Sequence, residues 1–229
     1  MTRVARIVIP DRPHHITQRG NNRQDVFFVP DDYAAYLGIL KQQSERYGLD
    51  VHAYCLMSNH IHLVATPRGK DALAKAVGRT HWLYARWINR LHGRSGHLWQ
   101  NRFYSSALDR RHFIAAMAYV ERSPVRARMH RKAWLYPWSS AAAHCGQQQT
   151  TATGLLNLRA WHRRWTGEEW RELLSQTEDR DLLEHIRTQT HRGRPLAGDS
   201  FLSRAETLLG RRVRPMPVGR PKTTTRKTK

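Results

Sequence analysis

Short strand patterns alternate with longer helical patterns over the first 130 residues, and this order constrains the fold more than any other feature. Period-two alternation marks the strands, and apolar residues three or four apart mark the helices. The predicted strands are 14–19, 51–57, 60–66 and 98–108, and the predicted helices are 31–47, 70–92 and 111–122. The order β-α-β-β-α-β-α is typical of a ferredoxin-like antiparallel sheet with helices on one face. We therefore predict an α+β fold with a basic, partly helical C-terminal extension.

The chain divides into three predicted regions, of which residues 1–145 are the α+β domain. Residues 146–191 form a linker and a helical segment, in which Thr166 and Glu169 match a capping box that begins a helix. Residues 192–229 hold 11 Lys and Arg against 2 Asp and Glu, so we expect a basic, DNA-binding and partly disordered tail.

The phrase Gly-Arg-Pro occurs twice in the tail, around Arg194 and Arg220. An extended segment tipped by arginine suits insertion into a narrow, A·T-rich minor groove. The alternative is a flexible basic tail without that function.

The whole chain is strongly basic, with a formal net charge of +21 and a pI of about 11.2. Such an excess indicates a polyanionic partner, most simply DNA or RNA. No apolar run is long enough to span a bilayer, so no membrane association is expected. Cys55 and Cys145 match no disulfide framework or zinc spacing, and the N-terminal apolar run is too short for a secretory signal. These features favour a cytoplasmic protein.

Two histidines, His60 and His62, occupy alternate positions of the predicted strand 60–66. Side chains two apart on a strand point to the same face, so the imidazoles lie close together while Ile61 and Leu63 face the helices. Two neutral imidazoles can bind one divalent cation. Such sites usually take zinc, copper or nickel, but a magnesium or manganese ion fits if DNA phosphates supply oxygen ligands. With 14 histidines in the chain, an accidental surface pair is the alternative.

The residue pattern so far does not identify the nucleophile that would attack a DNA phosphodiester, because either a water or a side chain can cleave one. Tyr119 is a candidate: in the predicted helix 111–122 it lies away from the apolar stripe of Phe113, Met117 and Val120. The alternative is a surface tyrosine that packs against a neighbouring loop. Ser123-Pro124 then reads as an N-cap followed by a proline in the first turn, so the helix is expected to break and restart there.

Four phrases in order resemble the REP-associated tyrosine transposases, which belong to the single-tyrosine HUH (histidine–hydrophobe–histidine) transposases. The resemblance covers about residues 1–145, and the tail is also similar. The four phrases are SNHIHL (58–63), HLWQNRFYSSAL (97–108), YVERSPVRA (119–127) and WLYPWSSAAAH (134–144).

This resemblance implies a mechanism. His60 and His62 hold a magnesium or manganese ion against the scissile phosphate, and Tyr119 attacks it to give a 5′-phosphotyrosine link and a free 3′ hydroxyl. Reversal of the step joins strands. The implied substrate is single-stranded DNA beside imperfect palindromic hairpins of repetitive extragenic elements, and the implied enzyme is a monomer or a homodimer.

The sequence departs from the family at one position. The family usually has Asn-Pro where this chain has Ser123-Pro124, and the asparagine is expected to help bind the metal. Serine has a shorter reach and no amide carbonyl. The possible third ligands are therefore Ser123, a water, or Glu121 if the helix bends.

Several polar and aromatic side chains suit contacts with single-stranded DNA, with an ordinary solvated basic surface as the alternative. Tyr104 is also the rival nucleophile, and Trp99 and Phe103 are expected in the core. The candidate DNA contacts are Arg19, Asn21, Asn22, Arg23, Arg102, Tyr104, Arg126, Arg128, Arg194 and Arg220.

The sequence thus predicts a metal-dependent DNA-cleaving and strand-joining enzyme with a tyrosine nucleophile. Two alternatives stay open: a non-catalytic protein that binds repetitive DNA hairpins, and a metal-dependent nuclease that uses water. The second would cut DNA without forming a covalent adduct.

Overall fold

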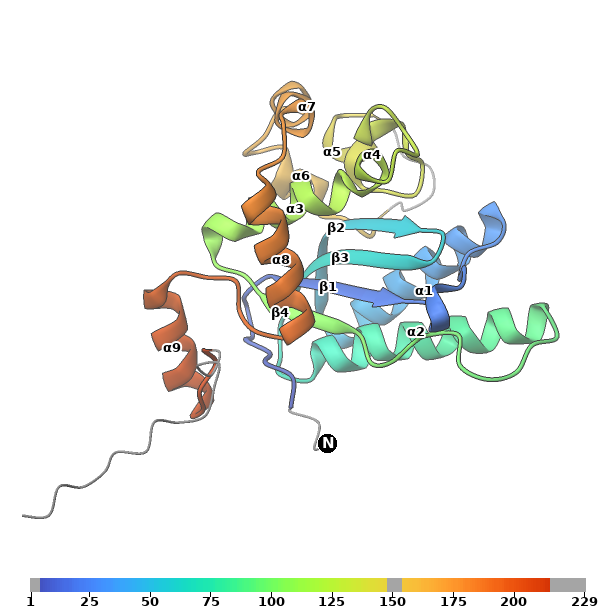
Figure 1. The fold of residues 1–229 in the computed structure, drawn as a ribbon, viewed down its shortest axis with the longest axis horizontal. Helices are drawn as coiled ribbons and strands as arrows, with labels where there is room; N and C mark the ends of the chain where they lie inside the picture. Colours follow the sequence, from blue (N-terminus) through green and yellow to red (C-terminus); the bar gives the residue numbers. More distant parts are fainter. Residues whose placement is uncertain (1–4, 148–153, 215–229) are drawn as a thin grey trace, which may run out of the picture.

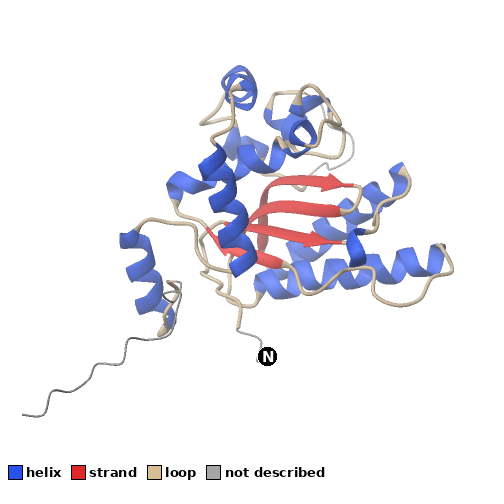
Figure 2. Cartoon of the chain, in the orientation of Figure 1, coloured by secondary structure: helices blue, strands red, loops and turns tan. Residues whose placement is uncertain are grey.

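The structure is a computed structural model that describes residues 5–147 and 154–214. Its centre is a four-stranded antiparallel sheet with the strand order β2-β3-β1-β4. The strands are β1 (His14–Arg19), β2 (Leu49–Met57), β3 (His60–Pro67) and β4 (Tyr104–Ala107). The predicted α+β class with an antiparallel sheet is confirmed, and Figure 2 shows the sheet between helices.

The helices follow the order expected from the sequence up to α3. They are α1 (Pro30–Tyr47), α2 (Ala72–Leu91), α3 (Arg110–Glu121), α4 (Ser123–Arg126), α5 (Ala141–His144), α6 (Leu158–Trp161), α7 (Gly167–Ser175), α8 (Arg180–Arg192) and α9 (Asp199–Leu209), with the short 3-10 helices η1 (Asn21–Arg23) and η2 (Ala133–Leu135). Helix α1 ends at Gly48, which adopts the left-handed conformation (φ 67°) that an L side chain rarely takes.

One face of the sheet packs against α1 and α2, which lie together on one side in Figure 1. Ile16, Leu63 and Tyr84 are fully buried members of this core. Alternation along the strands sends Ile61, Leu63 and Ala65 to this layer, as predicted, and leaves the opposite face for His60 and His62.

The opposite face is also covered, by α3 and by the segments that follow it. Val64 of β3 and Met117 of α3 share a second core with Trp170 and Ile186, which come from α7 and α8. Helix α8 crosses this face of the sheet beside β4 and β1 (Figure 1). The histidines therefore lie in a lined cavity and not on an open surface.

The fourth strand is shorter than predicted. Only Tyr104–Ala107 forms a ladder with β1, whereas residues 98–103 form a loop in which Trp99 makes an isolated bridge to Gly20. Trp99 and Phe103 fill the core from this loop, and the Trp99 Nε1 donates to the carbonyl of His81 at 3.0 Å. The prediction that Trp99 and Phe103 are core residues is confirmed. Their side chains pack into the core from the loop, and the residues are not part of strand β4.

The segment after α8 is packed against the sheet. The Leu196 amide donates to the Ala107 carbonyl at 2.8 Å, so this stretch runs alongside the end of β4. Helix α9 adds Phe201 and Ala205 to a small core with Ile7 and Ile9 near the N-terminus. The predicted capping box of Thr166 and Glu169 is confirmed at the start of α7.

Candidate functional site

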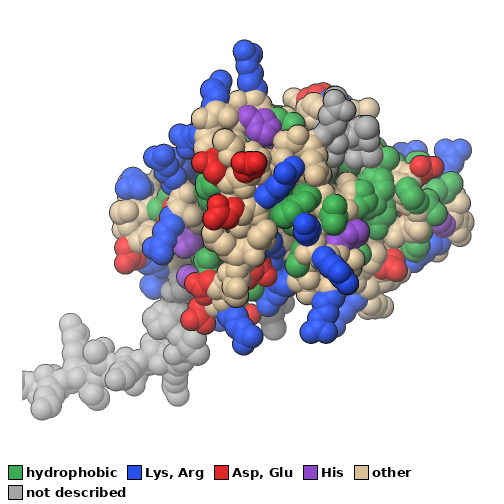
Figure 3. Space-filling model, turned by 90° about the horizontal axis from the view of Figure 1, so that it is seen from above, with side chains coloured by type: hydrophobic (Ala, Val, Ile, Leu, Met, Phe, Trp, Pro, Cys, Tyr) green, Lys and Arg blue, Asp and Glu red, His purple; other side chains and the backbone are tan. Residues whose placement is uncertain are grey.

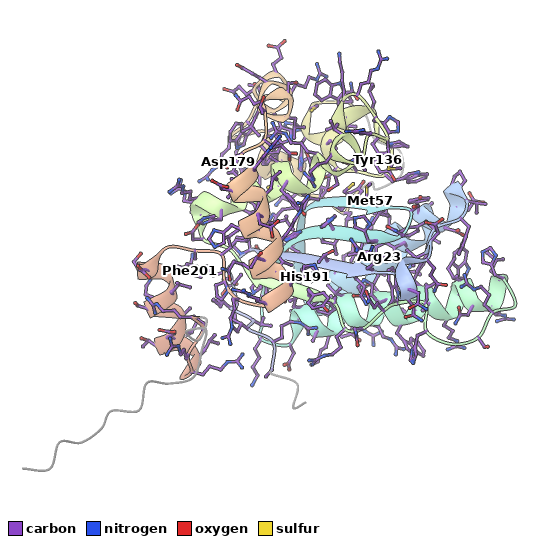
Figure 4. The ribbon with its side chains drawn as sticks, in the orientation of Figure 1. Arg23, Met57, Tyr136, Asp179, His191 and Phe201 are labelled. Carbon is purple, nitrogen blue, oxygen red and sulfur yellow. The ribbon has the colours of Figure 1, made fainter. Side chains whose placement is uncertain are left out.

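The two histidines lie where β3 begins, directly after the turn that joins it to β2. In the sheet register His60 is opposite Arg19 and His62 is opposite Thr17 of β1. The two imidazole rings are 5.0 Å apart, centre to centre. Both line a cavity of about 470 Å³, whose wall includes Met57 at the end of β2 and His191 on α8, labelled in Figure 4.

Each imidazole is held by a partner at its Nδ1 atom. Nδ1 of His60 donates to the side-chain oxygen of Asn59 at 2.6 Å, and Nδ1 of His62 lies 3.1 Å from Nε2 of His15. His15 stacks on His62 with their ring centres 5.3 Å apart, and its own Nδ1 lies 2.8 Å from the Thr190 hydroxyl on α8. The Nε2 atoms of His60 and His62 are left without such a partner among the described residues.

Burial keeps these imidazoles neutral. It lowers the pKa of His60 to about 4, helped by the nearby positive charges of Arg19 and Arg126. Burial also lowers the pKa of His62 well below its usual range, and the neighbouring histidines act in the same direction. Neutral imidazoles with a hydrogen-bonded Nδ1 and a free Nε2 are the form in which histidine binds metals.

The pair therefore fits a divalent cation as two ligands. Within residues 5–147 and 154–214, no group of three or more His, Cys, Asp or Glu side chains is arranged to hold a metal ion. A cation at this pair would take its remaining ligands from water or from phosphate oxygens, which are the ligands that magnesium and manganese prefer.

Tyr119, near the end of α3, lies beside the histidines. Its ring centre is 5.6 Å from that of His62 and 5.5 Å from that of His15, edge-on to both. The side chain lines the same cavity, although the residue is only 6% exposed. The structure thus brings together the tyrosine and the histidine pair that the sequence singled out separately.

Arg126 on α4 fixes the tyrosine segment. Its guanidinium carbon lies 4.1 Å from the centre of the Tyr119 ring, within the range of a cation–π contact. The same group donates to the Tyr119 carbonyl and to the Ser123 hydroxyl, both at 2.9 Å, and pairs with Glu178 at 2.7 Å. Arg126 therefore ties α3, α4 and the segment before α8 to one another around the nucleophile candidate.

Ser123 lies on the cavity wall, but not as the predicted N-cap. The helix does break and restart here, yet the cap position of α4 is Arg122. The Ser123 hydroxyl instead donates to the Tyr119 carbonyl one turn earlier, at 3.3 Å.

Glu121 points away from the cavity, so its prediction as a possible third ligand is wrong. It lies two residues from Tyr119, and two steps of about 100° place it on the other side of α3. Its carboxylate is fully buried and accepts from Trp170 Nε1 at 2.7 Å, from His144 Nδ1 at 2.6 Å and from the Ser140 hydroxyl. It is a structural acceptor in the second core.

The predicted DNA contacts fall into two groups. Arg19 and Arg126 line the cavity. Asn21, Asn22 and Arg23 form η1 directly after β1, where the Arg23 carbonyl accepts from Asn59 at 3.2 Å, so this turn adjoins the histidine pair.

The remaining predicted contacts lie away from the histidine pair or outside the described residues. Tyr104 is 37% exposed at the start of β4 and lies against His191, with ring centres 4.9 Å apart. Arg102 and Arg128 are exposed. The Arg194 guanidinium donates to the carbonyls of residues 212 and 213, and Arg220 lies outside the described residues.

Sequence reasoning missed His15 and the contribution of α8. His15 shares a face of β1 with Thr17 and Arg19, so the period of two is a signal, but only once the register with β3 is known. Thr190 comes from a helix 128 positions after His62, and no local pattern indicates that contact. Glu184, Arg187 and His191 of α8 complete this wall of the cavity.

No helix in the described part of the chain is long and apolar enough to cross a membrane. Lys and Arg side chains are spread widely over the face seen in Figure 3, in keeping with the net charge.

Comparisons with known proteins agree with this architecture. The family model described as "Transposase IS200 like" matches residues 11–123. The fold is similar to a REP-associated tyrosine transposase solved with a REP hairpin, at 16% identity and a TM-score of 0.54, over 66% of this chain and 88% of that one. A putative transposase from Deinococcus radiodurans is 18% identical over 52% of this chain and 96% of that one, with a TM-score of 0.37. No curated protein matches the chain.

The family match begins just before β1 and ends at Ser123, so it contains β1, the histidine pair and Tyr119. Thr190 and the rest of α8 lie beyond it. These matches support the identification of residues 11–123 as an IS200-like transposase domain, as the sequence phrases predict.

Proposed function

We propose that the chain cuts and rejoins single-stranded DNA through a covalent bond between Tyr119 and a 5′ phosphate. The observation that carries this proposal is the 5.6 Å separation between the Tyr119 and His62 rings inside one cavity. At this spacing a nucleophile and a pair of neutral imidazoles can act on the same phosphate group.

In the proposed reaction the Tyr119 oxygen attacks the scissile phosphorus, and the bond to the 3′ oxygen breaks. The phenolic proton leaves to solvent, and the departing 3′ oxygen takes up a proton to become a free hydroxyl. The product is a 5′-phosphotyrosine linkage. A 3′ hydroxyl of the same or another strand then attacks this linkage and releases the tyrosine, so no nucleotide cofactor is needed.

Magnesium or manganese is the proposed cofactor, with His60 and His62 as protein ligands and Ser123 or water as a further one. Such an ion polarises the phosphate oxygens and offsets the charge that develops during the attack. The chain's own residues do the positioning: His15 and Asn59 orient the imidazoles, and Arg126 fixes the tyrosine segment.

The proposed substrate is single-stranded DNA next to an imperfect palindromic hairpin. The solved transposase of similar fold holds a REP hairpin, and the net charge of +21 suits a polyanion of this kind. Arg19, at the mouth of the cavity, is placed to contact the backbone of a strand that enters it.

A non-catalytic hairpin-binding protein is the second candidate. Two observations favour it: within the described residues the pair lacks a third His, Cys, Asp or Glu ligand, and Tyr119 is only 6% exposed. This protein would bind the same DNA but form no covalent bond with it.

One experiment separates the two candidates. A pool of labelled oligonucleotides, each a hairpin with randomised single-stranded flanks, is incubated with the protein and Mn²⁺ and then denatured in detergent. The enzyme predicts a labelled band of protein covalently joined to DNA, which is absent for Tyr119→Phe and present for the control Tyr104→Phe. Binding of the pool without any such band supports the non-catalytic candidate. Cleavage that survives Tyr119→Phe supports a water-using nuclease.

A further inference from the structure

A second cavity, of about 640 Å³, lies at the other end of the strands from the histidine pair. Its floor is formed where β2 begins and β3 ends, by His52 and Thr66, whose side chains hydrogen-bond at 2.7 Å. The start of α3, the residue Arg164 after α6, and the start of α9 form its walls. Phe201, labelled in Figure 4, marks the α9 side.

Arginines from four separate segments converge on this cavity. None of their guanidinium groups forms an ion pair, a hydrogen bond or a ring contact with another residue of the described ranges 5–147 and 154–214. These arginines are Arg12, Arg110, Arg111, Arg164 and Arg204. Like-charged groups are gathered here without neutralising partners, which leaves their donors available to an anion.

The single acidic residue in the lining, Asp109, is already engaged. Its carboxylate accepts from the backbone amides of His112 and Gly198, both at 2.9 Å, and from His112 Nδ1 at 2.7 Å. His52 adds no charge near neutral pH, because burial lowers its pKa to about 4. The side chains that line the cavity therefore carry a net positive charge.

Two helices also begin at this cavity. Asp109 is the N-cap of α3, and its carboxylate accepts a hydrogen bond from the backbone amide of Gly198, the N-cap of α9. The first turns of both helices add partial positive charge to that of the arginines. The charge, the concave shape and the two helix starts all favour an anionic ligand with several charges.

We propose that this cavity binds the phosphodiester backbone of the DNA that reacts at the histidine–tyrosine site. This inference rests on the proposed function, because DNA is taken as the ligand. His62 and Thr66 are four residues apart on β3, so the two sites are separated by at least about 13 Å, or about four backbone steps of a duplex. A hairpin bound for cleavage is long enough to reach both.

The cavity is larger than one phosphate group needs, which fits a stretch of backbone. The chain's own last residues are excluded by charge: positions 215–229 include 5 Lys and Arg and no Asp or Glu. A cationic segment gains nothing from a cationic cavity.

The test compares two double variants that remove the same charge. Arg110→Gln/Arg204→Gln removes two cavity arginines, and the control Arg90→Gln/Arg163→Gln removes two exposed arginines outside both cavities. All four side chains are exposed, so the fold is expected to persist, and thermal melting checks this. Binding of a labelled hairpin oligonucleotide is measured by fluorescence anisotropy in EDTA over a range of salt concentrations.

We expect the cavity variant to bind the hairpin roughly tenfold more weakly at low salt than the control. The slope of log K against log salt should fall by about 2 if the contacts are to a duplex stem, and by about 1.4 if they are to a single strand. An unpaired oligonucleotide of the same length, measured in parallel, distinguishes contacts to the duplex stem from contacts to a single strand. Equal affinities and slopes for the two double variants would overturn the proposal.

The outcome is independent of catalysis, because EDTA prevents metal-dependent cleavage. If the slope falls but no covalent adduct forms with Mn²⁺, the cavity binds the DNA backbone as proposed and the proposed cleavage fails. If the adduct forms and the slope matches that of the control, only the cavity proposal fails.

Discussion

Nε2 of His15 lies 3.1 Å from Nδ1 of His62, and through His15 the helix α8 is linked to the proposed metal site. The chain of hydrogen bonds continues from His15 to the Thr190 hydroxyl. If the hydroxyl accepts from His15, His15 in turn accepts from His62, and the free lone pair of His62 is then on Nε2. In this arrangement of donors and acceptors, a residue of α8 sets the tautomer of a proposed metal ligand in β3.

Thr190→Val is therefore expected to weaken Mn²⁺ binding by about 10–100-fold, the usual effect of losing a hydrogen bond behind a metal-bound histidine. Isothermal titration calorimetry without DNA measures it. Thr188→Val is the matched control, because that hydroxyl donates to Glu184 and contacts neither His15 nor His62. Unchanged Mn²⁺ affinity in Thr190→Val would show that His62 needs no partner from α8.

Arg126→Lys should slow formation of the covalent adduct by about 100-fold while leaving hairpin binding nearly unchanged. Lysine keeps the charge but loses the planar fork that reaches Tyr119, Ser123 and Glu178 together. A small displacement of the attacking oxygen costs about this much. The control is Arg128→Lys, since Arg128 is exposed. Single-turnover assays of the two variants measure the difference, and equal rates count against a positioning role.

Glu121→Gln should destabilise the fold by about 3 kcal/mol without altering Mn²⁺ affinity. The buried carboxylate accepts from Trp170, His144 and Ser140, and an amide cannot satisfy all three donors. Urea unfolding measures the loss, with Glu172→Gln on the exposed surface of α7 as the control. Weaker Mn²⁺ binding with normal stability is the result that contradicts this structural role.

Stability should fall as the pH drops below about 6.5. Burial lowers the pKa of His14 to about 4 and that of His81 to about 3, so below 6.5 the unfolded chain binds protons that the folded chain does not. Each such histidine costs about 1.4 kcal/mol per pH unit until its folded pKa is reached, so the two together cost roughly 4 kcal/mol by pH 5.

Denaturant unfolding at pH 7.5 and pH 5 measures this loss. His81→Gln should reduce the loss by about 2 kcal/mol, because it removes one of the buried histidines whose pKa is lowered in the folded chain. A free energy of unfolding that is equal at both pH values contradicts the assignment of these histidines as buried and neutral.

Local patterns were sufficient to predict the elements that carry the proposed chemistry. The alternation in β3 placed His60 and His62 on one face, the apolar spacing over 31–47 predicted α1, and the capping box at Thr166 predicted the start of α7. Each of these features depends on residues that are close in sequence, which is why periodicity alone identifies them.

Features that depend on long-range packing were not predictable in the same way. The predicted strand 98–108 is a strand only over Tyr104–Ala107, because Trp99 and Phe103 pack into the core with α1 and α2. The environment of Glu121 is set by Trp170, 49 positions later, and the wall that includes Thr190 depends on how α8 crosses the sheet. A single sequence records none of these pairings.

Locating the covalent bond tests the proposed reaction of Tyr119 most directly. After reaction of the wild-type chain with hairpin DNA and Mn²⁺, the adduct is digested with nuclease and trypsin and analysed by mass spectrometry. A nucleotide is expected on the peptide 112–122, HFIAAMAYVER, with Tyr119 as the modified residue. Cleaved DNA with no modified peptide, or a nucleotide on Tyr104 instead, would contradict it.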